Sequence, residues 1–485
     1  MAVPKTLWKR NCSGIPRWFL YESIPSSIPD VSEYSVSGSP NPPVQKLPVE
    51  LLGEIFSWTL GDWGVMTDDP STLLLEPLTI SHVCGQWRSI SLSMPMLWAT
   101  IWIDHPRTSH VPMVKLWLER SRTCPLSINL RQTDPKSCLS FPTSTEHELT
   151  DEIFALLVPH LSRWQSVDLI FKTDTQQSLL SISGTEAVAL EHVALHVDSW
   201  DTAGAESLQS ALYARPSVRS VHLLSAPACT QHHVPWAQLI HLDATVLECT
   251  PDTCLALLAS CPALSSAKFT LSAQPDWPPA PFSHPEPHLT LPSLLDLSLK
   301  ASRIDLAPLL SRLTLPALRA LALDYAYVPH TALDCDSDPQ ALHALLTRSA
   351  CALDAFSLAE TARTHATPDR HIGFLQTPLL RSVKELELRV DMADELIRFL
   401  TFGSEGWNDD EPGPFSNLTG LVLRDVRGDH ICDDALRRML GSRFGGLRSA
   451  ELKLRMKSHC KNFGVECGLR DNLDLRFELL NCFCE

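Results

Sequence analysis

A six-residue hydrophobic pattern, L-x-x-L-x-L, recurs along most of the chain, with apolar residues at its first, fourth and sixth positions. Alternation of apolar and polar residues at the end of the pattern predicts a strand with one buried face. Copies begin at Trp164, Leu190, Val218, Leu239 (a degenerate copy), Leu264, Leu294, Leu318, Leu353, Val383, Leu418 and Leu447. Helical patterns follow several copies, at Asp252–Ser260, Asp338–Leu346, Asp391–Leu400 and Asp433–Leu440. Asp338 and Pro339 are predicted to be the N-cap and the first residue of their helix.

The spacing of this pattern predicts a repetitive α/β architecture. Successive copies begin 21 to 35 residues apart, which lies around the period of leucine-rich repeats, roughly 20–29 residues. Each strand and helix would bury its leucines only against its neighbours. We therefore expect a β/α leucine-rich-repeat solenoid (horseshoe) over residues 104–460. Its first unit would contain a strand at Ile101–Ile103, a helix at Pro112–Arg120 and a strand at Cys124–Leu130.

The ends of the chain and two insertions depart from this pattern. Residues 1–45 are rich in Ser and Pro and predict a disordered N-terminal arm. Residues 461–485 are expected to form a C-terminal cap or tail, with a strand near Leu473–Leu480. The Pro-rich run Gln274–Pro292 and the segment Ser404–Pro414 are predicted loops between units.

Residues 46–103 form a separate, helical block. Pro48 can open a helix whose apolar face includes Leu51, Leu52, Ile55 and Phe56. A second helical pattern runs from Leu78 to Ile90, with Gly85 inside it, where glycine costs about 1 kcal/mol relative to alanine. These patterns predict a small all-α bundle.

The residues of this block closely resemble the F-box. The resemblance rests on Leu47-Pro48-x-Glu50-Leu51-Leu52-x-x-Ile55-Phe56, followed by Val83-Cys84-x-x-Trp87-Arg88 and then Leu97-Trp98. The long segment between the two helical patterns and the phrase ISLSMPMLW look like the fungal form of that family. The resemblance implies docking on a Skp adaptor through Leu47, Pro48, Leu52, Ile55, Val83, Cys84, Trp87, Leu97 and Trp98. The alternative is that such positions are simply the core of a small helical bundle.

Composition narrows the possible partners and the compartment. A formal charge of −16 argues against a general nucleic-acid binder, which needs a basic surface. No apolar run reaches the length of a membrane span, and no apolar signal core follows the N-terminus, so we expect an intracellular protein in the cytoplasm or nucleus. Fifteen cysteines are scattered without C-x-x-C pairs, which favours buried free thiols over disulfides or a zinc site.

The sequence contains no catalytic signature for an esterase, a nucleotide-binding P-loop, a dinucleotide site or a zinc protease. Asp334–Asp338 imitates the start of a calcium loop, but Pro339 stands where glycine is needed and Leu345 where a bidentate Glu is needed. His196, His222 and either His241 or Asp243 could line up across the strands. Separate repeats rarely supply the three or four ligands of a metal site, so we expect no metal and no cofactor.

Positions flanking the second leucine of each copy are expected on the concave face of the solenoid. They give a possible target-binding face made of His196, His222, Asp243, Lys268, Lys300, Asp324, Glu387, Arg389, Arg424 and Lys453. The alternative is ordinary solvated strand residues. If a ligand binds there, an acidic or phosphorylated degron fits best.

Two functions are consistent with the sequence. The first is a non-catalytic substrate-recognition subunit of a Skp-cullin-F-box ubiquitin ligase, with a Skp adaptor, a cullin scaffold and a target protein as partners. The second is a leucine-rich-repeat interaction scaffold that acts outside a ubiquitin ligase. Neither reading involves catalysis by this chain, nucleic acid or a membrane.

Overall fold

The computed structural model divides the chain into two units, residues 1–55 and residues 56–485. The structure describes residues 47–59, 76–132, 144–172, 176–182, 189–197, 200–224, 234–273, 288–302, 304–327, 337–360, 368–401, 415–425, 431–443, 446–454 and 474–479. The predicted disordered arm, the predicted loop Ser404–Pro414 and most of the Pro-rich run lie outside these residues.

The N-terminal segment contains three helices, α1 (Val49–Thr59), α2 (Glu76–Val83) and α3 (Gly85–Ser93). Helix α1, which contains the boundary between the units, starts where Pro48 was predicted to open it: the Pro48 carbonyl accepts the first backbone hydrogen bond, from Leu52 at 3.1 Å. The prediction of one helix from Leu78 to Ile90 is wrong. Cys84 has extended backbone angles and separates α2 from α3, and its Sγ accepts a hydrogen bond from the Trp87 amide as the N-cap of α3.

A parallel sheet of fourteen strands dominates the second unit. Its order is β1 (Thr100–Asp104), β2 (Leu126–Arg131), β3 (Trp164–Ile170), β4 (His192–His196), β5 (Ser220–Leu223), β6 (His241–Cys249), β7 (Ser266–Ser272), β9 (Asp296–Ser302), β11 (Ala320–Tyr327), β12 (Ala355–Glu360), β13 (Glu385–Val390), β14 (Gly420–Asp425), β15 (Ser449–Leu454) and β16 (Asp474–Leu479). All eleven predicted copies of the hydrophobic pattern contain or lead into a strand. β3 starts on the first residue of its copy, and the other ten strands start two residues after theirs.

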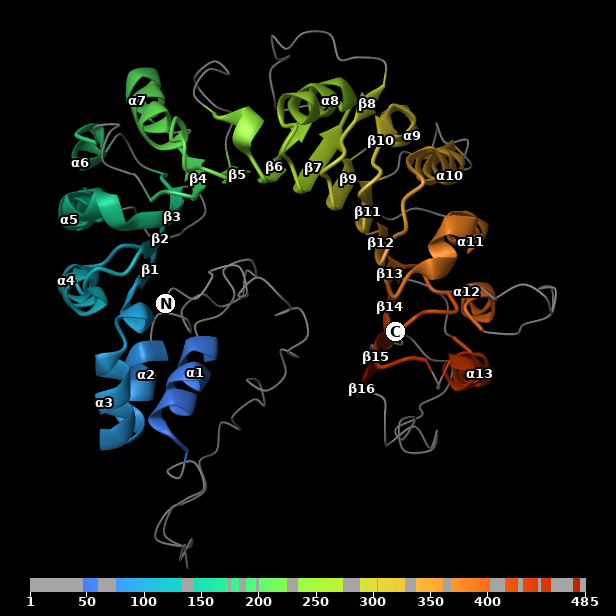
Figure 1. Ribbon diagram of the computed structural model, residues 1–485, viewed down its shortest axis with the longest axis horizontal. Coiled ribbons are helices and arrows are strands. Elements are labelled where there is room, and N and C mark those ends of the chain that lie inside the picture. Colours follow the sequence, from blue (N-terminus) through green and yellow to red (C-terminus); the bar gives the residue numbers. More distant parts are fainter. Residues whose placement is uncertain are drawn as a thin grey trace, which may run out of the picture. The chain divides into compact units, whose positions relative to one another are not determined.

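Helices connect many of these strands and lie along one side of the sheet (Figure 1). They are α4 (His110–Ser121), α5 (Ser144–Leu157), α6 (Gln177–Leu180), α7 (Thr202–Tyr213), α8 (Pro251–Ser260), α9 (Ala307–Leu310), α10 (Ser337–Ser349), α11 (Pro368–Leu375), α12 (Asp394–Phe399) and α13 (Asp433–Arg443). The four helices predicted after copies of the hydrophobic pattern overlap α8, α10, α12 and α13, and the helix predicted at Pro112–Arg120 lies within α4. The fold is therefore α/β, as predicted. None of the helices in the described residues is long and apolar enough to cross a membrane.

Leucine ladders between the sheet and the helices form the core of the second unit. Leu297, Leu321, Phe356, Leu386 and Leu421 stand side by side on five adjacent strands. Each is at most 1% exposed. Complete burial of such a side chain contributes about 1.5–3 kcal/mol, so the repeated leucines supply the main force that aligns the strands.

Arginines join neighbouring strand–helix units by donating hydrogen bonds to backbone carbonyls. Arg163 donates to the Cys124 carbonyl at 2.9 Å, and Arg348 to the Leu310 carbonyl at 2.9 Å. Arg443 donates to the carbonyls of Leu400 and Phe415 at 2.6 and 2.8 Å. These arginines supply hydrogen-bond donors to carbonyl groups at helix ends and in turns.

Candidate functional site

Exposed apolar side chains gather in the N-terminal segment. Eight large hydrophobic residues are exposed among the described residues, and six of them lie between residues 49 and 96: Val49, Leu51, Ile55, Val83, Leu92 and Met96. Only Val246 and Leu295 belong to the strand–helix units that follow. The first three belong to the first unit and the last three to the second. In each unit, exposed large apolar groups are a common mark of a docking surface.

Helices α2 and α3 carry the exposed residues Val83 and Leu92 of the second unit. Val83, at the end of α2, is 57% exposed. Arg88 on α3 donates from Nε to the Ser81 carbonyl at 3.0 Å, which fixes the angle between the two helices. The part-exposed Trp87 ring packs against buried Phe56, with 4.9 Å between the ring centroids.

The residues expected to contact an adaptor differ in exposure. Pro48, Ile55 and Val83 are exposed, and Leu47, Cys84 and Trp87 are partly exposed. Leu52, Leu97 and Trp98 are completely buried. The expectation that these last three contact a partner is therefore corrected, because a partner cannot reach their side chains in this structure.

Trp98 connects the helical segment to the first strand–helix unit. Its Nε1 donates to the Ser91 carbonyl at 2.9 Å. Its ring meets Trp117 of α4 edge-on at 4.9 Å, and the Arg120 guanidinium lies 4.2 Å above it. Trp98 is thus a core residue beneath the segment that carries the exposed apolar groups.

The second candidate is the polar sheet face, which we define as the strand positions between the buried leucines. All ten residues expected in the target-binding face occupy such positions, but only some become neighbours. His222, Asp243 and Lys268 are in register on β5, β6 and β7. His222 Nε2 lies 3.7 Å from Asp243 Oδ1, and Lys268 Nζ lies 3.7 Å from Asp243 Oδ2.

The expected alignment of His196 with His222 is wrong. Ala194 is the register partner of His222, whereas His196 pairs with Ile170 one step further along the strands. Lys172 Nζ lies 2.9 Å from His196 Nε2. The alternative residue His241 pairs with Ser220, so it also lies in a different row from His222.

The C-terminal half of the polar sheet face carries a row of charges. Lys300 and Asp324 are in register on β9 and β11. Arg389, Arg424 and Lys453 are in register on β13, β14 and β15. Arg389 forms an ion pair with Glu387 at 2.6 Å, and Arg424 forms one with Glu451 at 2.9 Å.

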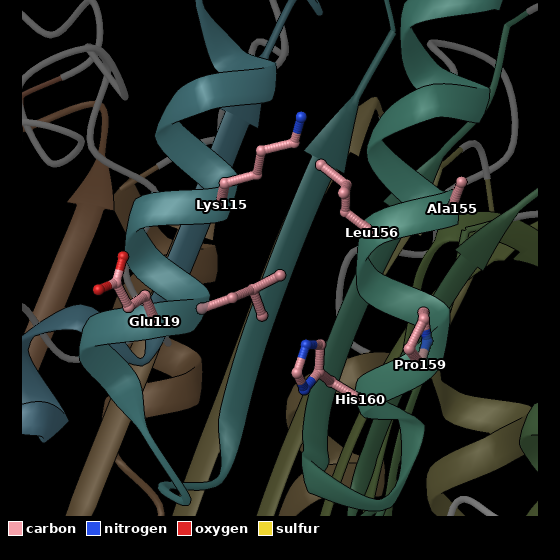
Figure 2. Close-up of a pocket in the computed structure, with 7 residues that line it drawn as sticks. Lys115, Glu119, Ala155, Leu156, Pro159 and His160 are labelled. Carbon is pink, nitrogen blue, oxygen red and sulfur yellow. The ribbon is translucent and has the colours of Figure 1, made fainter.

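A hollow of about 410 Å³ lies outside both candidates, in the helix layer. Figure 2 shows its side chains coming from α4 and from α5 with the turn after it: Lys115, Leu118, Glu119, Ala155, Leu156, Pro159 and His160. Burial, with a contribution from Arg163, lowers the pKa of His160. The lining offers no nucleophile beside a base, so it has no catalytic arrangement.

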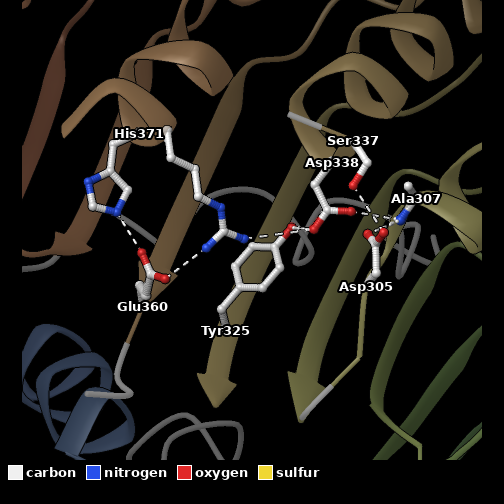
Figure 3. Close-up of polar contacts among 8 residues, drawn as sticks. Asp305, Ala307, Tyr325, Ser337, Asp338, Glu360 and His371 are labelled. Atoms are coloured by element: carbon white, nitrogen blue, oxygen red, sulfur yellow. Dashed lines mark hydrogen bonds and ion pairs between the residues drawn. The ribbon is translucent and has the colours of Figure 1, made fainter. Parts of the chain in front are cut away.

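Sequence reasoning missed a buried polar network that joins three consecutive strand–helix units (Figure 3). Asp338 was predicted as an N-cap, but α10 begins at Ser337 and the Asp338 carboxylate is buried. It accepts hydrogen bonds from the Tyr325 hydroxyl at 2.8 Å and the Ala307 amide at 2.7 Å. The N-cap prediction is therefore wrong, because Asp338 satisfies donors of other units instead of its own helix.

Further along, Glu360 completes this network by bridging two residues of α11. It accepts from Arg370 Nη1 at 2.9 Å and lies 2.6 Å from His371 Nε2. All three side chains are at most 6% exposed. No substrate can enter so enclosed a cluster, and we assign it to the stability of the fold.

Two carboxyl groups of the network have opposite pKa shifts. Burial, together with its hydrogen bond to Asp305, raises the pKa of Asp338 to about 7. Burial alone would raise the pKa of Asp305, but hydrogen bonds from the Asp338 carboxyl, the Ala307 amide and the Ser337 hydroxyl lower it. One proton is therefore shared by this pair and is held mainly by Asp338.

The described cysteines are unpaired thiols, four of them buried. Within the described residues, no group of three or more His, Cys, Asp or Glu side chains is placed to hold a metal ion. No family model matches the chain, and no curated protein matches it.

Proposed function

We propose that the chain is a substrate-recognition subunit of a Skp-cullin-F-box ubiquitin ligase. In this proposal residues 46–103 form an F-box bundle that docks on the Skp adaptor. Residues 104–460 form a leucine-rich-repeat solenoid that binds a target protein on its polar sheet face. The cullin scaffold is reached through the adaptor, and the complex works in the cytoplasm or nucleus.

One observation carries this proposal: exposed apolar side chains coincide with motif positions of the F-box resemblance. Ile55 is 40% exposed and Val83 is 57% exposed. Large apolar groups gain about 25 cal/mol for each Å² removed from water, so a partner surface that covers them would be stabilised. Burying a charge at either position without a counter-charge would oppose docking.

On this proposal the chain needs no catalytic residue and no cofactor. Its contribution is to hold a target close to the conjugating enzyme that another subunit brings. Tethering raises the effective concentration of the target near the reacting thioester, which accelerates transfer without new chemistry.

Co-purification of the full chain with the Skp adaptor tests this function. We expect the native chain to bind the adaptor, and Ile55→Glu and Val83→Glu each to weaken binding about tenfold or more, where tenfold corresponds to about 1.4 kcal/mol. The matched controls are Val246→Glu and Leu295→Glu, which change residues that are 52% and 43% exposed outside the helical segment. These controls should bind normally.

Two outcomes would overturn the proposal. Failure of the native chain to bind any Skp adaptor would remove the ligase function and favour an interaction scaffold outside a ligase. Binding weakened equally by the Val83 and Val246 substitutions would show that the exposed apolar residues of the helical segment are not the contact.

A further inference from the structure

The polar sheet face carries a row of charges made of Lys300, Asp324, Arg389, Arg424 and Lys453. Two polar atoms of this row have no hydrogen bond within the described chain. One carboxylate oxygen of Asp324, Oδ1, is enclosed and has no hydrogen-bond partner. The Nε of Arg424 is likewise an enclosed donor with no partner. Enclosed polar groups are nearly always paired in folded proteins, so these two atoms mark side chains whose hydrogen bonding the described chain leaves incomplete. Asp324 and Arg424 are both partly exposed, so a partner would reach their accessible atoms.

Asp324 is the acceptor end of this row. Small side chains flank it in the adjacent row, where Ser298, Ala322 and Ser357 are register neighbours. Burial raises the pKa of Asp324, and the opposing effects of Lys300 and Arg389 do not cancel that rise. A donor from a partner would therefore improve the environment of this carboxylate.

The donor end of the row lies on β13, β14 and β15. Arg389 and Arg424 are 45% and 34% exposed, and each forms an ion pair with one glutamate of the adjacent row. A guanidinium group has five N–H donors, so one ion pair leaves donors for a ligand. The glutamates also hold the guanidinium groups in place, which reduces the entropy lost on binding.

We propose that this row binds an extended segment of a partner protein that brings a lysine or arginine to Asp324 and carboxylates to Arg389, Arg424 and Lys453. The inference rests on the proposed role of the polar sheet face as the target-binding surface. Charge complementarity selects this occupant, since a uniformly acidic segment would place an acceptor against Asp324 and a uniformly basic one would repel the three cations.

Strand spacing sets the length of the segment. Neighbouring strands lie about 4.8 Å apart, so Asp324 is about 10 Å from the Arg389 position and about 19 Å from the Lys453 position. An extended peptide advances about 3.3 Å per residue. About seven residues cover the row from Asp324 to Lys453, with the basic residue at one end and the acidic residues over roughly the far four positions.

Two heptapeptides test the proposal, because the row does not fix the direction of the bound chain. One is Lys-Ser-Gly-Glu-Glu-Glu-Glu, and the other has the reverse order. Each is labelled with a fluorophore, and its binding to the full chain is measured by anisotropy at low and high salt. We expect one of the two to bind, with salt-sensitive affinity, and to bind several-fold more weakly when its lysine is replaced by alanine.

Variants assign the contacts. The double variant Arg389→Gln/Arg424→Gln should lower the affinity about tenfold or more. Asp324→Asn should lower the affinity for the lysine peptide to about the affinity for the alanine peptide. The affinity for the alanine peptide itself should not change. Lys115→Gln, which removes an exposed charge from helix α4, is the matched control and should have no effect. Unfolding curves of each variant check that the fold persists.

Each remaining result would overturn the proposal. The proposed binding site is excluded if neither peptide binds the native chain. It is also excluded if the double variant binds the peptide as well as Lys115→Gln does. If the native chain binds the lysine peptide and the alanine peptide with equal affinity, Asp324 does not contact the lysine. This result needs only the native chain. Skp binding by the same preparation separates the proposals: Skp binding without peptide binding overturns this inference alone, and peptide binding without Skp binding overturns the proposed function alone.

Discussion

Tyr325 and Asp338 are joined by a 2.8 Å hydrogen bond from the tyrosine hydroxyl to Asp338 Oδ2, and both side chains are buried. Tyr325 lies on β11 and Asp338 on α10, the next helix. Arg370 of α11 lies 4.7 Å above the Tyr325 ring and 3.9 Å from the same Asp338 oxygen. Contacts from three elements therefore meet at one carboxyl group.

Loss of the Tyr325 hydroxyl should destabilise the protein. Tyr325→Phe keeps the ring but leaves an enclosed carboxyl oxygen without its donor, which costs about 1–3 kcal/mol. Asp338→Ala, which removes the acceptor, should be similarly harmful. The double variant should be less destabilised than the sum of the two, because both substitutions remove the same bond. Urea unfolding of the four proteins measures this coupling, and strict additivity would show that the bond contributes nothing.

The raised pKa of Asp338 predicts a pH dependence of stability. Asp338 has a pKa of about 7 in the folded chain, against 3.8 for an ordinary aspartate, so between these values the folded state binds more protons than the unfolded state. Its contribution to stability is then complete below about pH 4 and is lost as pH rises through 7. The free energy of unfolding of the native protein, relative to Asp338→Asn, should fall between pH 4 and 7 and level off above. A difference that rises with pH would contradict a protonated Asp338.

The positions of the strands could be predicted because alternation is a local property. Leu321 and Leu323 face the helices while Ala322 and Asp324 face away, and the sequence alone displays this alternation. Burial of the leucines is also the dominant energy term, so the sequence pattern and the structure agree on every predicted strand.

Polar pairing could not be predicted in the same way. The hydrophobic pattern does align Val193 with Val221 and Leu195 with Leu223, and this alignment places Ala194 beside His222. The expectation for His196 is wrong because His196 follows the last apolar position of its copy, whereas His222 precedes the last apolar position of its own. Asp338-Pro339 has the local form of a helix start. The Tyr325 hydroxyl on β11 and the Ala307 amide on α9 compete for the carboxylate, and neither is marked in the sequence next to Asp338.

The F-box resemblance singled out Ile55 and Val83, which are exposed. It also implied that Trp98 contacts a partner, whereas the Trp98 side chain is buried. Removing that ring should affect folding rather than only docking. Trp98→Ala deletes a fully buried indole that packs on Trp117, at a cost of about 3–5 kcal/mol. It should lower the unfolding midpoint and Skp binding together. Val83→Glu should lower only the binding, with a stability change within about 0.5 kcal/mol. Normal stability of Trp98→Ala would place this residue on the surface.

Arg443 should be far more important to stability than its neighbour Arg438 on the same helix. Arg443 is 7% exposed and donates to two carbonyls outside α13, whereas Arg438 is exposed and donates to the Asp434 carbonyl within its own helix. Burial lowers the pKa of Arg443 to about 10, so the guanidinium stays charged at neutral pH.

Arg443→Ala would remove the arginine donor from the Leu400 carbonyl and would leave the Phe415 carbonyl with the Leu418 amide alone, and we expect a loss of about 3 kcal/mol or more in urea unfolding. Arg438→Ala, the matched control, should change stability by less than about 0.5 kcal/mol. Arg443→Lys should recover only part of the loss, because one ammonium group cannot reproduce the planar fork that reaches both Leu400 and Phe415. Equal stability of the two alanine variants would show that the carbonyls find other donors, and that this arginine does not hold α13 to the preceding unit.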